Sequence, residues 1–378
     1  MSNNYAGLRR ALRDEVGAAE RCAERLLAIR KRLAPIRRRR SDAALLLATW
    51  NIRDFDSNKY GFGPRRPETF YYLAEMIACF DLVAIQEVNR DLSALYRLME
   101  ILGREWDFIA TDTTEGVGGN AERMAFVYNT EKVQFRRIAG EVVLPDGQLV
   151  VSRKKVKPPK DQPDAEPAEV EVEQQFARSP FLVAFQSGWF RFSLCTVHIY
   201  YGSDSGEKLE RRIAEIEQLV EFFANRQDIA SRQEKDRHGA VENYILLGDF
   251  NVVSPEHKTM TALKGHGFKV PAAIDGKKVR DEDDHFYDQI AVRVKDPRFR
   301  VAGGGMIDIF ADVFRDTLED RALYAPHIAK GEGEMDVSAA QYRKWRTWQM
   351  SDHAPLWIEI ETDFADDYLG DIAGGRSD

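Results

Sequence analysis

An aspartate and an asparagine stand where a long apolar run of this sequence stops. The run Tyr-Ile-Leu-Leu at 244–247 leads into Gly-Asp-Phe-Asn, which places Asp249 and Asn251 directly after it. Continuous apolar runs are typical of strands buried on both faces, and aspartate and asparagine are poor strand residues. The pattern predicts a strand that delivers a carboxylate and an amide to a sheet edge, with a turn or a helix cap as the alternative.

Other apolar runs of the chain end in polar residues of the same kinds. These residues are Asn51, Glu87, His198, Asp352 and His353. Because strand ends of a twisted sheet meet at one edge, they predict a single polar pocket. Carboxylates and amides are hard oxygen ligands that suit Mg²⁺, Mn²⁺ or Ca²⁺, and the two histidines suit proton transfer or contact with a phosphate.

The elements that must carry these residues alternate between apolar strands and amphipathic helices, which predicts an α/β fold. A stretch rich in Lys, Glu and Pro at 152–175 is expected to be a surface insertion within a hairpin. Strands are expected at 45–51, 81–87, 108–111, 122–128, 181–185, 189–198, 244–249, 286–292, 300–305 and 354–360, and helices at 68–79, 92–102 and 205–225.

Residues 5–34 are expected to form one further helix. Leu12, Ala19, Leu26 and Leu33 recur every seven residues, before Pro35 and a basic run that ends at residue 40. Such a seam fits an amphipathic helix packed on the main domain, a helix for self-association, or a nucleic-acid-binding arm.

Composition limits the class of protein. The chain has 378 residues, a net charge of −8 and 44% apolar residues, which allows a large core. An acidic balance does not favour non-specific binding of polyanions, but it suits a carboxylate-rich metal site. No apolar run reaches the ~18 residues of a membrane span, and the three cysteines show no C-x-x-C spacing, so a cytoplasmic protein without membrane contact is expected.

Eight short motifs, taken in order, resemble those of the endonuclease/exonuclease/phosphatase superfamily, the deoxyribonuclease I-like fold. The resemblance covers roughly residues 44–362, and it is closest to the deoxyribonuclease I branch, although Gln289 replaces that branch's arginine. The motifs are Trp50-Asn51-Ile52-Arg53, Ile85-Gln86-Glu87-Val88, Glu122-Arg123-Met124-Ala125-Phe126-Val127-Tyr128, Arg178-Ser179-Pro180-Phe181, Thr196-Val197-His198, Gly248-Asp249-Phe250-Asn251, Tyr287-Asp288-Gln289-Ile290 and Ser351-Asp352-His353.

The resemblance implies an architecture and a set of domains. The expected fold is a four-layer α-β-β-α sandwich of two packed mixed β-sheets flanked by helices, with an extra N-terminal helix. Residues 1–40 would be the amphipathic helix and basic run, residues 41–363 the catalytic domain, and residues 364–378 a flexible acidic tail.

The resemblance also implies the roles of the metal-binding and basic groups. Glu87 would be the main ligand of Mg²⁺ or Mn²⁺, with Ca²⁺ as an accessory ion, and Asn51 and Asp352 would help. Asp352 would also orient His353, which would act as general base or stabilise the transition state.

The remaining roles concern water and phosphate. Asp249 would orient or deprotonate the attacking water, and Asn251 would hold a phosphate oxygen. His198, paired with Glu122, would act as an acid or contact a phosphate. A buried structural histidine at position 198 and a surface charge at position 122 are the alternatives.

Two further positions complete the implied site. Asp288 would support His198 or a second metal, unless it is a structural cap, and Arg178 would bind a phosphate, unless it is a surface arginine. The implied activity is metal-dependent hydrolysis of phosphodiesters by an activated water, with DNA as the nucleic-acid partner. A phosphatase of small or lipid phosphoesters, and an inactive binding module, are the alternatives.

Two segments, the insertion at 152–175 and residues 339–349, have no assigned counterpart in the family. Residues 339–349 contain Tyr342, Trp345 and Trp348 among basic residues. A helix that packs these three aromatic side chains is favoured over a basic aromatic surface for nucleic acid.

Overall fold

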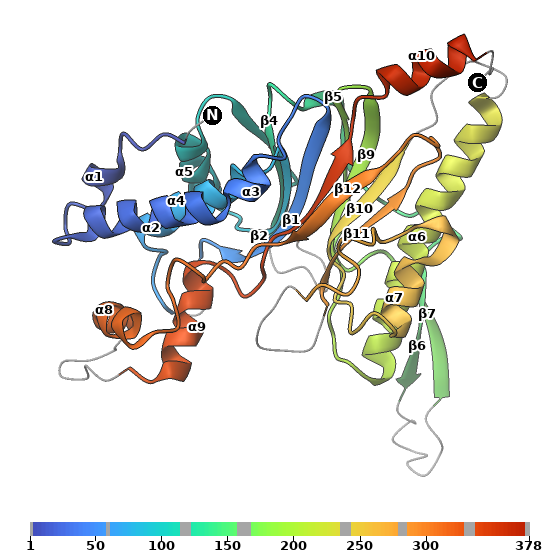
Figure 1. Ribbon diagram of the computed structural model, residues 1–378. Coiled ribbons are helices and arrows are strands. Elements are labelled where there is room, and N and C mark those ends of the chain that lie inside the picture. Colours follow the sequence, from blue (N-terminus) through green and yellow to red (C-terminus); the bar gives the residue numbers. More distant parts are fainter. Residues whose placement is uncertain are drawn as a thin grey trace, which may run out of the picture.

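The structure is a computed structural model of the chain, and it describes residues 3–57, 61–113, 122–156, 168–234, 243–278, 286–328 and 337–374. Two β-sheets pack face to face and helices cover both outer faces (Figure 1). This arrangement confirms the predicted four-layer α-β-β-α sandwich. Among the described residues, no helix is both long and apolar enough to cross a membrane.

The first sheet has six strands in the order β12-β13-β1-β2-β4-β3. It is mixed, because β1 and β2 are parallel while the other neighbouring strands are antiparallel. Its strands are β1 (Ala44–Phe55), β2 (Leu82–Val88), β3 (Trp106–Ala110), β4 (Arg123–Asn129), β12 (Val301–Met306) and β13 (Leu356–Glu361).

The second sheet has five strands in the order β11-β10-β9-β8-β5, with β9 and β10 parallel. Its strands are β5 (Gln134–Glu141), β8 (Phe181–Ser187), β9 (Phe190–His198), β10 (Tyr244–Asp249) and β11 (Asp288–Arg293). The predicted insertion forms a separate antiparallel pair, β6 (Val150–Val156) and β7 (Ala168–Gln174), beside the long helix α6 (Figure 1). Its residues 157–167 lie outside the described part of the chain.

The alternation of side chains along β1 explains the four layers. Leu45 and Leu47 join the core between the two sheets, whereas Leu46 and Ala48 join the core beneath the helices. Strand side chains point alternately to the two faces, so one wholly apolar strand is buried from both sides. Helices α4 (Pro67–Ile77) and α5 (Ser93–Leu102) cover the first sheet, and α6 (Gly206–Glu234) and α7 (Lys258–Leu263) cover the second.

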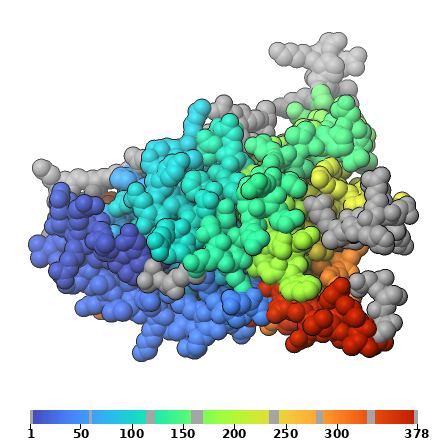
Figure 2. Space-filling model, turned by 90° about the horizontal axis from the view of Figure 1, so that it is seen from above, coloured from blue at the N-terminus to red at the C-terminus, as the bar shows by residue number. Residues whose placement is uncertain are grey.

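The N-terminal segment is three helices and not one, which corrects the prediction for residues 5–34. They are α1 (Leu8–Ala11), α2 (Ala18–Arg32) and α3 (Ala34–Arg37). Gly17 adopts a φ of 75° at the start of α2, a conformation that favours glycine and that interrupts the helical path. Leu26 and Ile29 of α2 are buried against the main domain, where α2 contacts α4. Figure 2 shows the segment, in dark blue, lying on the surface beside the residues that follow it.

The C-terminal part holds α8 (Leu318–Ile328), α9 (Ala339–Gln349) and α10 (Ala365–Ala373). Three aromatic residues of α9, Tyr342, Trp345 and Trp348, are buried. This confirms the prediction of a helix that packs these side chains, and not the alternative of an exposed aromatic surface for nucleic acid. The predicted flexible tail is instead helical over 365–373. The Tyr368 ring of α10 lies 5.7 Å from that of Trp189, and α10, red in Figure 2, rests on the surface.

Candidate active site

The register of the second sheet sets three polar residues side by side. Asp249 of β10 lies opposite His198 of β9 and also opposite Asp288 of β11. Residues opposite one another on neighbouring strands share a face of the sheet, so the three side chains are presented together. The first sheet adds Asn51 from β1 and Glu87 from the end of the neighbouring β2.

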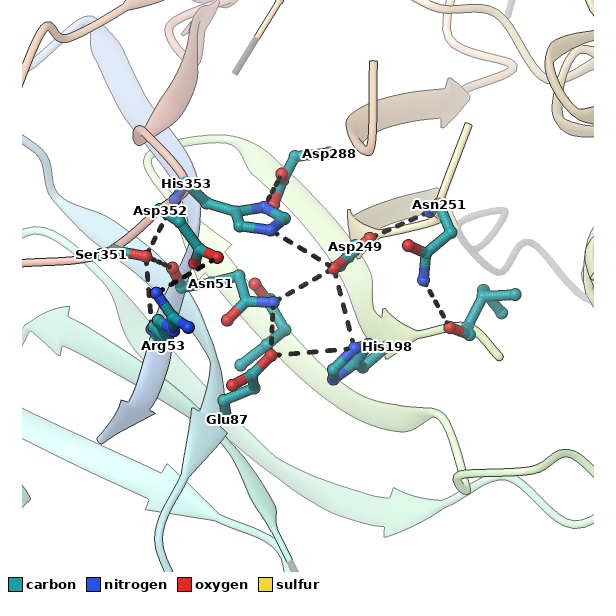
Figure 3. A network of polar contacts seen from close by, with 12 residues as sticks. Asn51, Arg53, Glu87, His198, Asp249, Asn251, Asp288, Ser351, Asp352 and His353 are labelled. Carbon is teal, nitrogen blue, oxygen red and sulfur yellow. Dashed lines mark hydrogen bonds and ion pairs between the residues drawn. The ribbon is translucent and has the colours of Figure 1, made fainter. Parts of the chain in front are cut away.

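Asp249 is the centre of the contacts in this cluster (Figure 3). The Asn51 amide Nδ2 donates to Asp249 Oδ2 at 3.1 Å and to Glu87 Oε1 at 3.0 Å. His198 Nε2 lies 3.7 Å and His353 Nε2 lies 4.0 Å from the same Asp249 Oδ2. Two imidazoles from different parts of the fold therefore face one carboxylate oxygen.

His353 is held by Asp288. The His353 Nδ1 to Asp288 Oδ2 distance is 2.5 Å, and both side chains are buried. Burial alone would lower the pKa of His353, but the facing Asp288 carboxylate, with Asp249 and Asp352 nearby, outweighs it and raises the pKa. His353 is therefore held in its charged form with Nε2 directed at Asp249.

This geometry corrects two predicted pairings. Asp288, and not Asp352, orients His353, and Asp288 supports His353 rather than His198. The Asp352 carboxylate instead lies 3.8 Å from Arg53 Nη1 and is partly exposed. The predicted role of Asp352 as a metal ligand stays a prediction.

His198 has a carboxylate partner of its own in Glu122, as predicted. His198 Nδ1 lies 2.7 Å from Glu122 Oε1, and Arg178 Nε lies 2.5 Å from the same oxygen. Burial would lower the pKa of His198, but the Glu122 carboxylate outweighs it and raises the pKa. Arg178 also donates to the backbone carbonyl of His198 at 3.2 Å. Arg178 thus contacts Glu122 and the backbone of His198. The predicted contact of Arg178 with a phosphate stays a prediction.

Asn251 supports the conformation of the strand end. Its φ is 52°, its amide Nδ2 donates to the Ile199 carbonyl at 2.7 Å, and its backbone N–H donates to Asp249 Oδ1 at 2.9 Å. The buried Arg212 donates to the Asn251 carbonyl at 2.9 Å. A non-glycine residue at positive φ is costly and persists where its surroundings fix it, as they do here.

Two further residues of the motifs, Ser351 and Trp50, have supporting roles that the sequence analysis did not assign. Ser351 Oγ donates to the Asn51 carbonyl at 2.6 Å and accepts from the His353 backbone N–H at 3.0 Å. Trp50 Nε1 donates to the His353 carbonyl at 2.8 Å. These bonds attach the His353 loop to β1. A serine two residues before His353 is the local signal, because Ser side chains commonly bond the backbone two residues on.

The donor set fits a hard divalent cation. Glu87, Glu122 and His198 offer ligand atoms within 4.8 Å of one another. Glu122 is already paired with Arg178 and His198, so Glu87 is the better placed carboxylate of the three. Asn51 Oδ1 is buried and has no hydrogen-bond partner among the residues that the structure describes. A buried amide oxygen beside a carboxylate is the donor combination that Mg²⁺ or Mn²⁺ accepts.

No protein-family model matches this chain, and no curated protein sequence matches it. Several solved structures are similar to this chain in fold. An endonuclease/exonuclease/phosphatase family protein from Bacteroides thetaiotaomicron is 17% identical with a TM-score of 0.49, and the match covers 85% of this chain and 98% of that one. The human Nocturnin catalytic domain with bound sulfate is 11% identical (TM-score 0.47, 84% and 94% covered). D. rerio TDP2 complexed with a single-strand DNA product is 10% identical (TM-score 0.46, 84% and 99% covered).

Proposed function

We propose that this protein is a divalent-metal-dependent phosphodiesterase of the endonuclease/exonuclease/phosphatase superfamily and that its substrate is DNA. The observation that carries the proposal is the meeting of two carboxylate-backed imidazoles, His198 and His353, at the single carboxylate of Asp249. The motif at 287–290, which resembles the deoxyribonuclease I segment, supports DNA as the substrate.

The side chains of the cluster match the charges that develop during hydrolysis of a phosphodiester. Negative charge grows on the non-bridging oxygens and on the leaving oxygen, and fixed donors stabilise that charge. His198 and His353, whose pKa values are both raised by facing carboxylates, can supply such donors through their Nε2 atoms. Asp249, between them, is the group that would orient the attacking water and accept its proton.

Glu87 and Asn51 are the residues that would hold a divalent cation at this site. When bound, such an ion stabilises charge on a phosphate oxygen. Asn51 Oδ1 would bind the ion, while the Asn51 amide nitrogen donates to Glu87 and Asp249. Binding of Mn²⁺, measured by titration calorimetry, should therefore weaken in both Glu87→Gln and Asn51→Ala proteins.

The proposal is tested with supercoiled plasmid and single-stranded circular DNA in Mg²⁺ or Mn²⁺. We expect cleavage of DNA by the wild-type protein, and no cleavage in EDTA or with His353→Ala. His327→Ala is the matched control, because it removes a partly exposed histidine whose partner is Glu15 of the N-terminal segment. The proposal would be overturned if the metal-loaded protein cleaved neither the plasmid nor the single-stranded DNA. It would also be overturned if activity survived His353→Ala.

A further inference from the structure

A row of rings leads from the surface to the candidate active site. The Tyr287 ring is stacked on the His353 imidazole, with centroids 5.7 Å apart and planes at 29°. The Tyr201 ring meets Tyr287 edge to face, with centroids 6.2 Å apart. Tyr287 is 5% exposed, whereas Tyr201 is 42% exposed. Tyr201 is therefore the accessible end of a row that begins at His353.

Tyr201 is held in place although it is an exposed residue. Its hydroxyl donates to Asp204 Oδ2 at 3.0 Å, and the Arg212 guanidinium lies 4.7 Å from its ring centroid. Arg212 is buried and donates through Nε to the Tyr201 carbonyl at 2.9 Å. The same Arg212 binds the carbonyl of Asn251 in the site. The loop that carries Tyr201 is thus fixed to the catalytic cluster through one buried arginine.

A rigid exposed aromatic ring has a specific use beside a phosphodiester centre. Tyrosine offers a large flat surface, and little conformational freedom is lost on binding when the ring is already fixed. Every nucleobase has a flat face, and proteins that hold single strands stack bases on such rings without reading their sequence. A paired base inside a duplex cannot reach a side-chain ring in this way, so the ring suits an unpaired nucleotide.

We propose that Tyr201 is a stacking platform for the unpaired base of a nucleotide beside the scissile phosphodiester. The inference rests on the proposed function, because it takes the His198–Asp249–His353 cluster as the point of cleavage. It narrows the substrate class to nucleic acid that is single-stranded, or locally unpaired, at the nucleotide next to the cut. Sequence preference at that nucleotide is expected to be weak.

The test measures binding of short fluorescent single-stranded oligodeoxynucleotides in EDTA, by anisotropy, so that it does not depend on hydrolysis. The oligonucleotides are one intact sequence and a series in which a single base at each position is replaced by an abasic residue. We expect one abasic position to weaken binding to the wild-type protein about tenfold. Tyr201→Leu should weaken binding of the intact strand by the same factor and remove the sensitivity to that position.

Two variants separate stacking from a structural role. Tyr201→Phe keeps the ring and should bind like the wild type. Trp189→Leu is the matched control, because Trp189 is an exposed aromatic residue whose ring packs against Tyr368 of α10 at an interplanar angle of 45°. It should also bind like the wild type.

The outcomes distinguish this inference from the proposed function. No binding by the wild-type protein, no sensitivity to any abasic position, or an equal loss with intact and abasic strands in Tyr201→Leu would each overturn the stacking platform. Cleavage of the same oligonucleotides in Mg²⁺ is measured separately. Base-sensitive binding without metal-dependent cleavage would leave the platform standing and overturn the phosphodiesterase.

Discussion

His353 Nδ1 lies 2.5 Å from Asp288 Oδ2, although the two residues come from opposite sides of the sandwich. Asp288 begins β11 in the second sheet, while His353 lies in the loop that Trp50 and Ser351 attach to β1 in the first. The pair therefore bridges the two sheets. Packing of the sheets is what brings the imidazole to Asp249, so the geometry of the site depends on the core between them.

Asp288→Asn should lower the rate of phosphodiester cleavage about a thousandfold, because the histidine loses the carboxylate that fixes its orientation and charge. Initial rates with a fixed metal concentration measure this. Since the two residues act as one unit, Asp288→Asn added to His353→Ala should cause little further loss. Multiplicative losses in the double variant would show that Asp288 acts independently of His353.

Gly248→Ala should separate Asp249 from His198. Gly248 has a φ of 131°, and a Cβ there would lie 2.2 Å from the Val197 carbonyl oxygen on β9. A backbone clash on top of an unfavourable φ should lower the free energy of unfolding by about 3 kcal/mol or more and abolish cleavage.

Gly140→Ala is the control for that substitution, because Gly140 also lies in a strand but a Cβ there would meet no other atom within 4 Å. It should leave the urea midpoint unchanged or slightly raised. Equal midpoints for the two alanine variants would contradict the clash.

The sequence indicated which residues gather at the site, because polar residues that end apolar runs must lie at strand ends. Asn51 and Asp249 are such residues, and they share a hydrogen bond at 3.1 Å. The partner of His353 could not be read in the same way, because Asp288 is 65 residues away and their meeting depends on how the two sheets pack. Proximity in the sequence favours Asp352, the residue next to His353, instead.

The errors at the two ends of the chain have local causes. The seven-residue spacing of leucine and alanine residues at the N-terminus matched one long helix, but Gly17 interrupts it, and only part of the predicted seam is buried. The acidic, Gly-rich C-terminus matched a frayed tail. Contacts of Tyr368 with Trp189 and of Asp367 with Arg300 accompany a helix there, and such tertiary contacts are not visible in composition.

Glu75→Ala should destabilise the protein by loosening the N-terminal segment. Glu75 of α4 is wholly buried and accepts bonds from Arg30, at 3.1 Å, and from Arg37, with Asn3 and Tyr5 adding two more donors. Removing one member of a buried charged network leaves its partners uncompensated, so we expect a loss of about 3 kcal/mol in urea unfolding.

Glu20→Ala is the control for Glu75→Ala. Glu20 lies exposed in the first turn of α2, and its removal should change stability by less than about 0.5 kcal/mol. Similar losses in both variants would mean that the network around Glu75 contributes no more than a surface charge.

Glu215 lies beneath the loop that carries Arg178. Its carboxylate accepts the backbone N–H of Ala177 at 3.1 Å, and the side chain is buried on α6. Burial raises the pKa of Glu215 from its ordinary value of 4.5 to about 7, although the Ala177 N–H and the nearby Arg211 and Arg178 act in the opposite direction.

The wild-type protein should therefore lose stability as the pH rises through this range. Between pH 4.5 and about 7 the folded state binds more protons at Glu215 than the unfolded state, so its contribution is present at low pH and is lost above about 7. Glu215→Gln keeps an oxygen for the Ala177 N–H but does not titrate. Urea unfolding of both proteins across this range should give curves that diverge by about 3 kcal/mol in free energy of unfolding, with the wild type falling more steeply. Parallel curves would show that the Glu215 carboxylate titrates normally in the folded protein.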